Sequence, residues 1–260
     1  MKVPLATVGG TTEILRLAAR HRTVPTHHVS TVGVYAGTDA PPVGPEHPTG
    51  PPEALEHGYT RSKWVAEGLV EEARRRGLPV TVYRPTRVAA HSRTGACQQG
   101  DYLWLILKGC IQAQAAPSRV DAAFDLAPVD YVADAVVALS LLPAAADPTF
   151  HLAAGRLLRL ETALDWLRAM GHHLPEVSPQ AWLDRIGADP GNAAFPLLGT
   201  LAAELTGGGS EGGLTFDPAA TDAALATTDV SRPAFDRELF GRCTARFNAT
   251  GWLPEPGGER

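Results

Sequence analysis

The pattern of apolar and polar positions alternates between helical and strand spacing along most of this chain. Apolar residues at helical spacing predict helices at 11–20, 59–76, 101–112 and 130–142. Short, nearly continuous apolar runs predict buried strands at 26–35, 80–83 and 150–153. A chain in which strands and helices take turns in this way folds as a parallel sheet covered by helices on both faces. We therefore expect an α/β fold. On the first helix, we expect Ile14, Leu15, Leu17 and Ala18 to share one apolar side.

Proline and glycine divide the chain further. The proline-rich stretch 38–57 predicts a loop that joins neither a helix nor a sheet, and Gly77 predicts the end of the second helix. Residues 160–205 are expected to be helical, and a weaker helix is expected near 233–246. The glycine-rich segment 207–213 predicts a flexible linker. We accordingly divide the chain into a core at 1–155 and a mostly helical lobe at 156–260.

Composition narrows the function classes. With 260 residues, 44% of them hydrophobic, the chain can bury a full core. A net charge of −5 argues against a nucleic-acid groove, and we expect the basic run 74–76 to be a solvated helix end. Three widely spaced cysteines predict a reducing compartment, and the adjacent histidine pairs are not expected to bind metal. Without a long apolar run or a signal peptide pattern, the protein is expected to be cytoplasmic and not bound to membranes.

The most informative chemistry is a tyrosine, Tyr59, four positions before a lysine, Lys63, at the start of the second predicted helix. Positions i and i+4 lie on one helical face, so a phenol and an ammonium can reach the same reacting group. A nearby ammonium favours the phenolate and is expected to lower the tyrosine pKa toward the working pH. A phenol tuned in this way can serve as a general acid for a carbonyl oxygen.

Several stretches together resemble the thioester reductase domains of nonribosomal peptide synthetases and carboxylic acid reductases, within the extended short-chain dehydrogenase/reductase superfamily. They are ATVGGTTEILRLAA (6–19), HHVSTVGVY (27–35), GYTRSKWVAEGLVEEARRRGLPVTVYRPTRV (58–88), HSRTGA (91–96), APVDYVADAVVALS (127–140) and FHLAAG (150–155). The resemblance covers roughly residues 5–205 and is most specific in SKWVAE, RGLPV and YRP.

The resemblance implies a partial Rossmann-like, doubly wound parallel sheet at 1–155 and a helical lobe at 156–260 that binds the substrate and its carrier. It implies a catalytic set of Thr31, Tyr59 and Lys63. Thr31 is chosen because the active hydroxyl of extended members lies four residues before a tyrosine, here Tyr35. Ser30 should then point to the opposite face, because side chains alternate along a strand.

For the cofactor, the resemblance implies NADPH. Its contacts are expected from Ser30, Tyr59, Lys63, Arg84, Pro85 and Thr86, with the backbone around Pro85 and Thr86 flanking the nicotinamide. The family pattern also includes a glycine-rich turn between a strand and a helix, which binds the pyrophosphate. No Gly-x-x-Gly-x-x-Gly stretch before a helix occurs in these 260 residues.

Three interpretations therefore stay open. The first is an NADPH-dependent thioester reductase that releases an acyl or peptidyl chain from a phosphopantetheinyl carrier protein as an aldehyde or alcohol, its N-terminal part lying outside this sequence or supplied in trans. The second is a cofactor-independent acid/base enzyme that cyclises or releases a carrier-bound chain. The third is a non-catalytic remnant or docking module. Without preceding strands, the strand at 26–35 is expected to be a sheet edge that invites association.

Overall fold

The computed structural model describes residues 5–38, 42–55, 57–142, 148–207 and 214–257. The chain forms two compact units. The first comprises Met1–Val88, Asp130–Gly155 and Leu214–Pro233, and the second comprises Ala89–Val129, Arg156–Gly213 and Ala234–Arg260. The sequence-based division at residue 155 assigns each part of the chain to one continuous stretch. In the structure each unit is made of three stretches, so that 89–129 belongs to the second unit and 214–233 to the first.

A parallel sheet forms the centre of the first unit. Its strands are β1 (Thr26–Val29), β2 (Val80–Pro85) and β6 (Thr149–Leu152), in the order β1-β2-β6. All neighbours run parallel, with Val29 paired to Tyr83 and Pro85 to Leu152.

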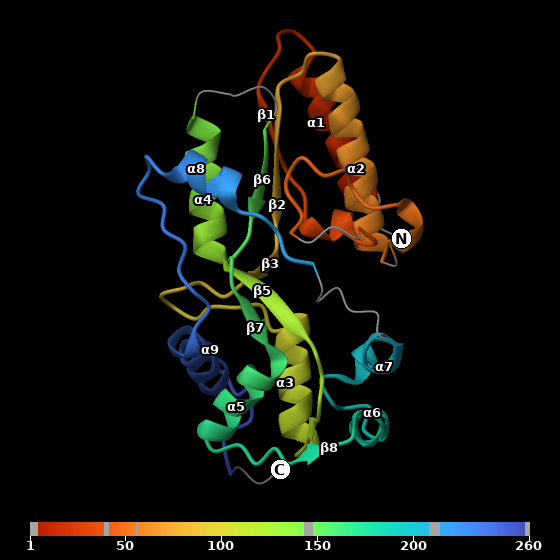
Figure 1. Ribbon diagram of the computed structural model, residues 1–260, viewed down its shortest axis with the longest axis vertical. Coiled ribbons are helices and arrows are strands. Elements are labelled where there is room, and N and C mark those ends of the chain that lie inside the picture. The colour runs from red at the N-terminus through yellow and green to blue at the C-terminus, as the bar shows by residue number, and fades with distance from the viewer. Residues whose placement is uncertain (1–4, 39–41, 56, 143–147, 208–213, 258–260) are drawn as a thin grey trace. The chain divides into compact units, whose positions relative to one another are not determined.

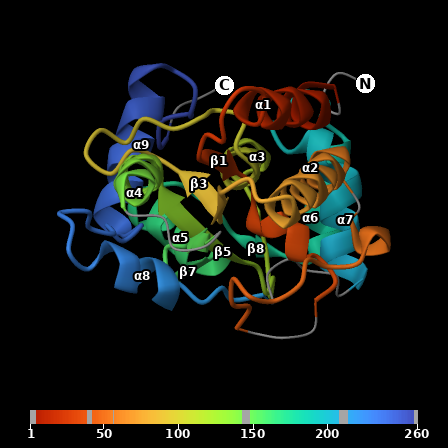
Figure 2. The ribbon, with the colours of Figure 1, turned by 90° about the horizontal axis from the view of Figure 1, so that it is seen from above.

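Helices cover both faces of this sheet. The views in Figures 1 and 2 place α1 and α2 on one face and α4 and α8 on the other. Their bounds are α1 (Gly10–Ala18), α2 (Gly58–Arg75), α4 (Val129–Leu141) and α8 (Ala219–Leu225). The predicted α/β fold with a parallel sheet and helices on both faces is confirmed. Helix α8 was not predicted.

The predicted strand at 26–35 is shorter in the structure. Strand β1 ends at Val29, and a 3₁₀ helix, η2 (Val32–Tyr35), follows after two residues of extended chain. The Thr31 hydroxyl oxygen accepts a hydrogen bond from the Gly33 N–H at 3.2 Å, which caps this turn. A hydroxyl that bonds the backbone locally competes with the sheet ladder, so the chain leaves the sheet here.

The predicted apolar side of α1 is only partly covered by the fold. Leu15 and Ala18 pack with Val70, Val80 and other residues in the core of the first unit. Ile14 and Leu17 are instead 55% and 64% exposed. The helix is also preceded by a π-helical turn, η1 (Leu5–Gly9). The apolar spacing identified the helix but did not show how much of its apolar surface the fold covers.

The basic run at the end of α2 is only partly solvated. Arg75 and Arg76 are exposed, as expected, and pair with Glu72. The Arg74 guanidinium instead donates hydrogen bonds to the carbonyl oxygens of Val80, at 2.7 Å, and Pro148, at 3.0 Å. Arg74 therefore ties the end of α2 to the segments that begin β2 and precede β6.

The sequence predicted a loop at 38–57 and a linker at 207–213. Residues 42–55 are mostly irregular, as expected, but include a 3₁₀ turn, η3 (Pro52–Ala54), and a bridge between Val43 and Phe216. The predicted linker at 207–213 begins at the last residue of α7, and 208–213 lie outside the described residues.

The second unit combines helices with short strands. Its longest sheet has the order β3-β5-β7, in which β5 and β7 are antiparallel, and β4 pairs with β8. The strands are β3 (Arg87–Ala89), β4 (Ala116–Pro117), β5 (Ala123–Pro128), β7 (Leu157–Arg159) and β8 (Glu176–Val177). The helices are α3 (Tyr102–Ala113), α5 (Leu160–Ala169), α6 (Pro179–Gly187), η4 (Phe195–Leu197), α7 (Leu198–Gly207) and α9 (Arg237–Ala249).

Aromatic rings from several helices meet in the core of the second unit. Trp104 of α3 stacks on Phe240 of α9 with ring centroids 5.1 Å apart, and Trp166 of α5 lies 5.2 Å from the same phenylalanine. Trp182 of α6 is fully buried. Because these rings come from four helices far apart in sequence, α5, α6 and α9 pack on one core with α3.

We expect a marked contrast between two glycine-to-alanine substitutions. Gly95 has φ +65°, and a Cβ there would lie 2.6 Å from the carbonyl carbon of Arg242. Gly95→Ala should therefore lower the free energy of unfolding by about 2–4 kcal/mol, through left-handed strain and overlap with α9. Gly68, inside α2, has open space around its Cβ position, so Gly68→Ala should stabilise by about 1 kcal/mol. Denaturant unfolding measures both, and equal effects would contradict these backbone assignments.

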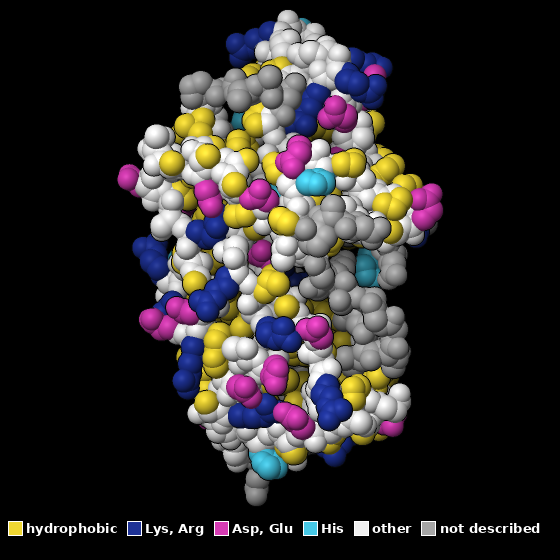
Figure 3. Space-filling view, viewed as in Figure 1, with side chains coloured by type: hydrophobic (Ala, Val, Ile, Leu, Met, Phe, Trp, Pro, Cys, Tyr) yellow, Lys and Arg dark blue, Asp and Glu magenta, His cyan; other side chains and the backbone are white. Residues whose placement is uncertain are grey.

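The surface seen in Figure 3 carries basic and acidic side chains interspersed with one another. Among the described residues, no helix is long and apolar enough to cross a membrane. Within the same residues, no three histidine, cysteine or acidic side chains are grouped closely enough to hold a metal ion.

Candidate active site

Tyr59 and Lys63 lie together in the first two turns of α2. The Lys63 Nζ is 6.0 Å from the centroid of the Tyr59 ring, and the Tyr59 side chain is 51% exposed. The same Nζ donates a hydrogen bond to the Val29 carbonyl oxygen at 2.8 Å. This bond fixes the lysine to the carboxyl end of β1 and leaves two of its protons for other partners.

Thr31 is held beside the first turn of α2 by a close approach at Gly33. A Cβ on Gly33 would lie 2.9 Å from the Thr60 methyl group and 3.6 Å from the Thr31 hydroxyl oxygen. The η2 turn thus packs directly against the residue that follows Tyr59. Because the Thr31 oxygen is the acceptor in its bond with Gly33, the hydroxyl proton is available to another acceptor.

The protonation of the pair differs from the sequence-based expectation. Burial raises the pKa of Tyr59, and no lowering by Lys63 outweighs it. Burial lowers the pKa of Lys63, while the nearby Glu67 carboxylate opposes that change. The expectation that Lys63 brings the Tyr59 pKa down toward neutrality is therefore wrong for this structure. A raised pKa keeps the phenol protonated at neutral pH, which is the state that a proton donor requires.

The residues predicted to contact a cofactor gather at one edge of the sheet. Because β1 and β2 are parallel, Ser30 and Thr31 emerge at the same edge as Pro85 and Thr86. The backbone N–H of Ser30 still bonds the Tyr83 carbonyl at 2.7 Å, and its hydroxyl is buried without a hydrogen-bond partner among the described residues. An orphaned buried hydroxyl at the carboxyl end of a strand is a place where a ligand group can bind.

Arg84 is placed differently from the other predicted contacts. Its guanidinium is buried and donates to both carboxylate oxygens of Glu67 and to the Tyr35 hydroxyl. Because the Arg84 side chain is engaged in these contacts, a cofactor would contact the 84–86 segment through its backbone atoms and through Pro85 and Thr86.

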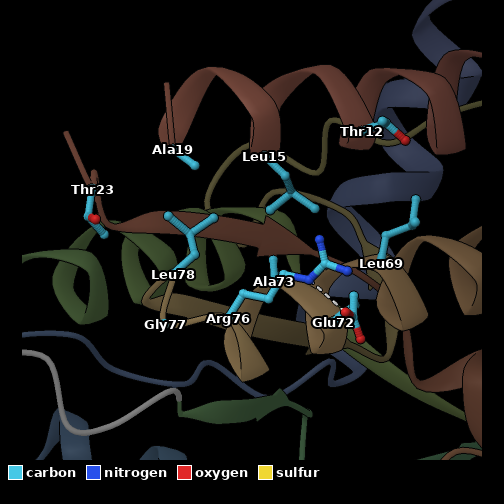
Figure 4. Close-up of a pocket in the computed structure, with 10 residues that line it drawn as sticks. All are labelled: Thr12, Leu15, Ala19, Thr23, Leu69, Glu72, Ala73, Arg76, Gly77 and Leu78. Carbon is cyan, nitrogen blue, oxygen red and sulfur yellow. Dashed lines mark hydrogen bonds and ion pairs between the residues drawn. The ribbon is translucent and has the colours of Figure 1, made fainter. Parts of the chain in front are cut away.

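Two hollows adjoin α1 and α2. The larger, about 400 Å³, lies between η1, α1 and the outer side of β1, and Lys63, Val29 and His28 line it. The smaller, about 260 Å³, lies between the later turns of α1 and α2 (Figure 4). Figure 4 shows Leu15 and Leu69 facing this smaller hollow and Arg76 paired with Glu72 at its side. Of these two hollows, the larger is the one that reaches a residue of the predicted catalytic set.

Pattern reasoning missed three residues beneath the site. They are Tyr35, Glu67 and His151, and all three are buried. Arg84 contacts both Glu67 and the Tyr35 hydroxyl, and the same hydroxyl contacts His151. For Glu67 a signal was present, since it lies on the same helical face as Tyr59 and Lys63, four positions further on. Tyr35 and His151 gave no such signal, because their pairing joins residues far apart in the sequence.

A parallel sheet flanked by helices, with a tyrosine–lysine pair and a hydroxyl at its carboxyl edge, defines a Rossmann-like dinucleotide-binding domain. The NAD-binding family described as "Male sterility protein" matches residues 3–136. The chain belongs to this family, and the solved structures it is similar to include reductase domains of nonribosomal peptide synthetases.

Individual relatives agree with this assignment. The chain is 34% identical over 257 residues to a linear gramicidin synthase polypeptide of Brevibacillus parabrevis, covering 95% of this chain and 5% of that protein. It is 34% identical over 271 residues to the isonitrile lipopeptide synthase of Streptomyces coeruleorubidus, covering 98% of this chain and 18% of that protein. The crystal structure of the terminal R domain of the myxalamid biosynthetic pathway is 40% identical, with a TM-score of 0.87, covering 96% of this chain and 64% of that one. The chain thus spans less than two thirds of each of these relatives.

Proposed function

We propose that this chain carries the catalytic residues of an NADPH-dependent thioester reductase. Its substrate is an acyl or peptidyl chain held as a thioester on a phosphopantetheinyl carrier protein, and its product is an aldehyde or alcohol. The observation that carries the proposal is the Lys63–Val29 hydrogen bond, which sets Tyr59 and Lys63 beside the carboxyl end of β1, where Thr31 lies. Membership in an NAD-binding reductase family supports it.

The proton steps follow from the three side chains. The Thr31 hydroxyl, whose oxygen already accepts from Gly33, donates to the thioester carbonyl oxygen and orients it. Tyr59, kept protonated by its raised pKa, gives its proton to that oxygen as negative charge develops. The Lys63 ammonium then stabilises the phenolate. Once a hydride has added to the carbonyl carbon and a proton to its oxygen, the thiohemiacetal collapses to the aldehyde and the carrier thiol.

The described residues fit the nicotinamide end of the cofactor. When bound, the reduced nicotinamide supplies the hydride. Ser30, with its orphaned hydroxyl, and Lys63, with two further protons, would hold that end together with Tyr59 and the backbone at Pro85 and Thr86. The choice of NADPH over NADH rests on the resemblance to thioester reductases.

The outer edge of β1 is the surface through which we propose association with another polypeptide. Among the described residues, β1 has β2 as its strand neighbour on one side and no strand on the other. An open strand edge presents unpaired backbone groups that readily pair with an added strand. A segment that completes the cofactor-binding half, whether from the same polypeptide or in trans, is the occupant we expect there.

One assay tests the proposed reaction. An acyl carrier thioester is presented with and without NADPH, and aldehyde and free thiol are followed separately. Aldehyde that forms only with NADPH supports the reductase. Thiol or a cyclised product that forms without NADPH, and is lost in Tyr59→Phe, supports the cofactor-independent enzyme instead. No product under any condition, with Tyr59→Phe indistinguishable from wild type, indicates a binding module.

The affinity for the cofactor should be low for these 260 residues by themselves. The glycine-rich turn that supplies backbone donors and a helix N-terminus to the pyrophosphate does not occur in this sequence. Titration calorimetry should therefore find NADPH binding much weaker than in the complete R domains. Micromolar affinity would contradict this expectation and would mean that another segment contacts the phosphates.

A further inference from the structure

A buried ion pair lies one helical turn beyond Lys63. Glu67 of α2 and Arg84 of β2 have side chains only 8% and 9% exposed. Arg84 donates from Nε to Glu67 Oε1 at 3.1 Å and from Nη2 to Oε2 at 2.5 Å. This two-pronged contact fixes both the distance and the orientation of the two side chains. It holds the catalytic helix in one register on the central strand of its sheet.

The pair continues into a larger buried network. The Arg84 guanidinium lies 4.7 Å from the centroid of the Tyr35 ring and donates to its hydroxyl. The Tyr35 oxygen in turn lies 2.9 Å from His151 Nε2. Tyr35 ends the η2 turn that Thr31 caps, and His151 belongs to β6. One network therefore joins the turn that carries Thr31 to the helix that carries Tyr59.

Glu67 also acts on Lys63 through its negative charge. Tyr59, Lys63 and Glu67 follow one another at four-residue spacing along one face of α2. Burial lowers the pKa of Lys63, and Glu67 counteracts that change. From β1, His28 also faces this lysine, but burial lowers the pKa of His28 to about 4, so it is uncharged at neutral pH. The carboxylate of Glu67 is thus the nearby charge that favours the ammonium form of Lys63.

We propose that Glu67, clamped by Arg84, is a positioning residue that orients the Tyr59–Lys63 face of α2 and keeps Lys63 in its charged form. The expected effect of Glu67 on turnover rests on the proposed reductase function. The expected effect of Glu67 on the charge of Lys63 can be measured without any turnover. The proposal for Glu67 and the proposed function can therefore fail separately.

The chain offers a direct measurement, because Lys2, Lys63 and Lys108 are its lysines. With ¹³C introduced biosynthetically at the lysine ε carbon, NMR follows the titration of each lysine, and Lys63→Met assigns the Lys63 signal. In Glu67→Gln, Lys63 should lose its proton at lower pH than in wild type, while Lys108 stays unchanged. The control is Glu72→Gln, which removes an exposed carboxylate from the same helix and should leave Lys63 unaffected.

Glu67→Gln alone leaves the Arg84 charge buried without its partner, which destabilises the fold. The double variant Glu67→Gln/Arg84→Met removes both charges and should recover much of the stability. If the inference holds, this double variant still titrates Lys63 at lower pH, and its kcat falls by roughly 10- to 100-fold with a smaller change in KM. A double variant that folds and matches wild type in both the Lys63 titration and kcat overturns the inference. If the wild type itself gives no turnover, the proposed function fails, and the titration still decides the role of Glu67.

Discussion

Tyr59→Phe is expected to lower carbonyl reduction by roughly 10²–10⁴-fold, because phenylalanine keeps the ring and removes the acidic proton. The side chain is half exposed and its hydroxyl donates no hydrogen bond to the residues that the structure describes, so the variant should unfold at the same denaturant concentration as wild type. The measurement is kcat for aldehyde formation from a carrier-bound thioester with NADPH.

A matched tyrosine serves as the control for this substitution. Tyr83 lies in β2, and the contact of its hydroxyl is with His27 Nδ1, at 2.9 Å, rather than with Thr31, Tyr59 or Lys63. Tyr83→Phe removes the same hydroxyl type and should keep most of the activity. If both variants lose activity equally, or if Tyr59→Phe loses none, Tyr59 is not the proton donor.

Lys63→Met should reduce activity to a similar extent and should also shift the pH dependence. Burial already raises the pKa of Tyr59, and removing the cation 6.0 Å from its ring raises it further. Reduction requires the phenol form, so the loss of activity caused by phenol ionisation should move to higher pH. The dependence of kcat on pH, measured with wild type and Lys63→Met, checks both the size and the direction.

The size of that shift separates two variants. Lys63→Met should move the alkaline limit to higher pH, and Glu67→Gln, in which Lys63 loses its charge at lower pH, should move it in the same direction by a smaller amount. Lys108→Met, in the second unit, removes a lysine that stands over the Trp252 ring and should leave the pH dependence as in wild type. An alkaline limit that moves to lower pH in Glu67→Gln would rule out the charge relation proposed between these residues.

Local spacing was sufficient to predict helices in both units. The helices at 59–76, 101–112 and 130–142 appear within two residues of the predicted bounds, because amphipathic periodicity and a glycine such as Gly77 act over a few residues. The shorter strands of the second unit, such as Ala116–Pro117 and Glu176–Val177, were not predicted. Two-residue strands have no period of their own and form only where a partner segment lies alongside.

In the candidate site, too, some features follow from local spacing and others depend on the tertiary structure. The i, i+4 spacing of Tyr59 and Lys63 is enough to place both side chains on one face, since a helix fixes that relation locally. The resemblance supplied Thr31, and the structure shows how Gly33 lets its turn approach α2. The pKa directions could not be predicted, because burial from distant segments outweighs the charge of a neighbour 6.0 Å away.

The sequence by itself determined the order of the strands in the parallel sheet and of the longer helices between them, the α/β class and the shared face of Tyr59 and Lys63, all of which depend on residues within one or two helical turns. The tertiary structure alone decided that β1 ends at Val29, that Ile14 and Leu17 stay exposed, and that Arg84 is committed to Glu67 and Tyr35. Each of these outcomes depends on which distant segment covers a side chain or pairs with its charge. That information arises only when the chain closes on itself, because burial and ion pairing join residues that no local pattern relates.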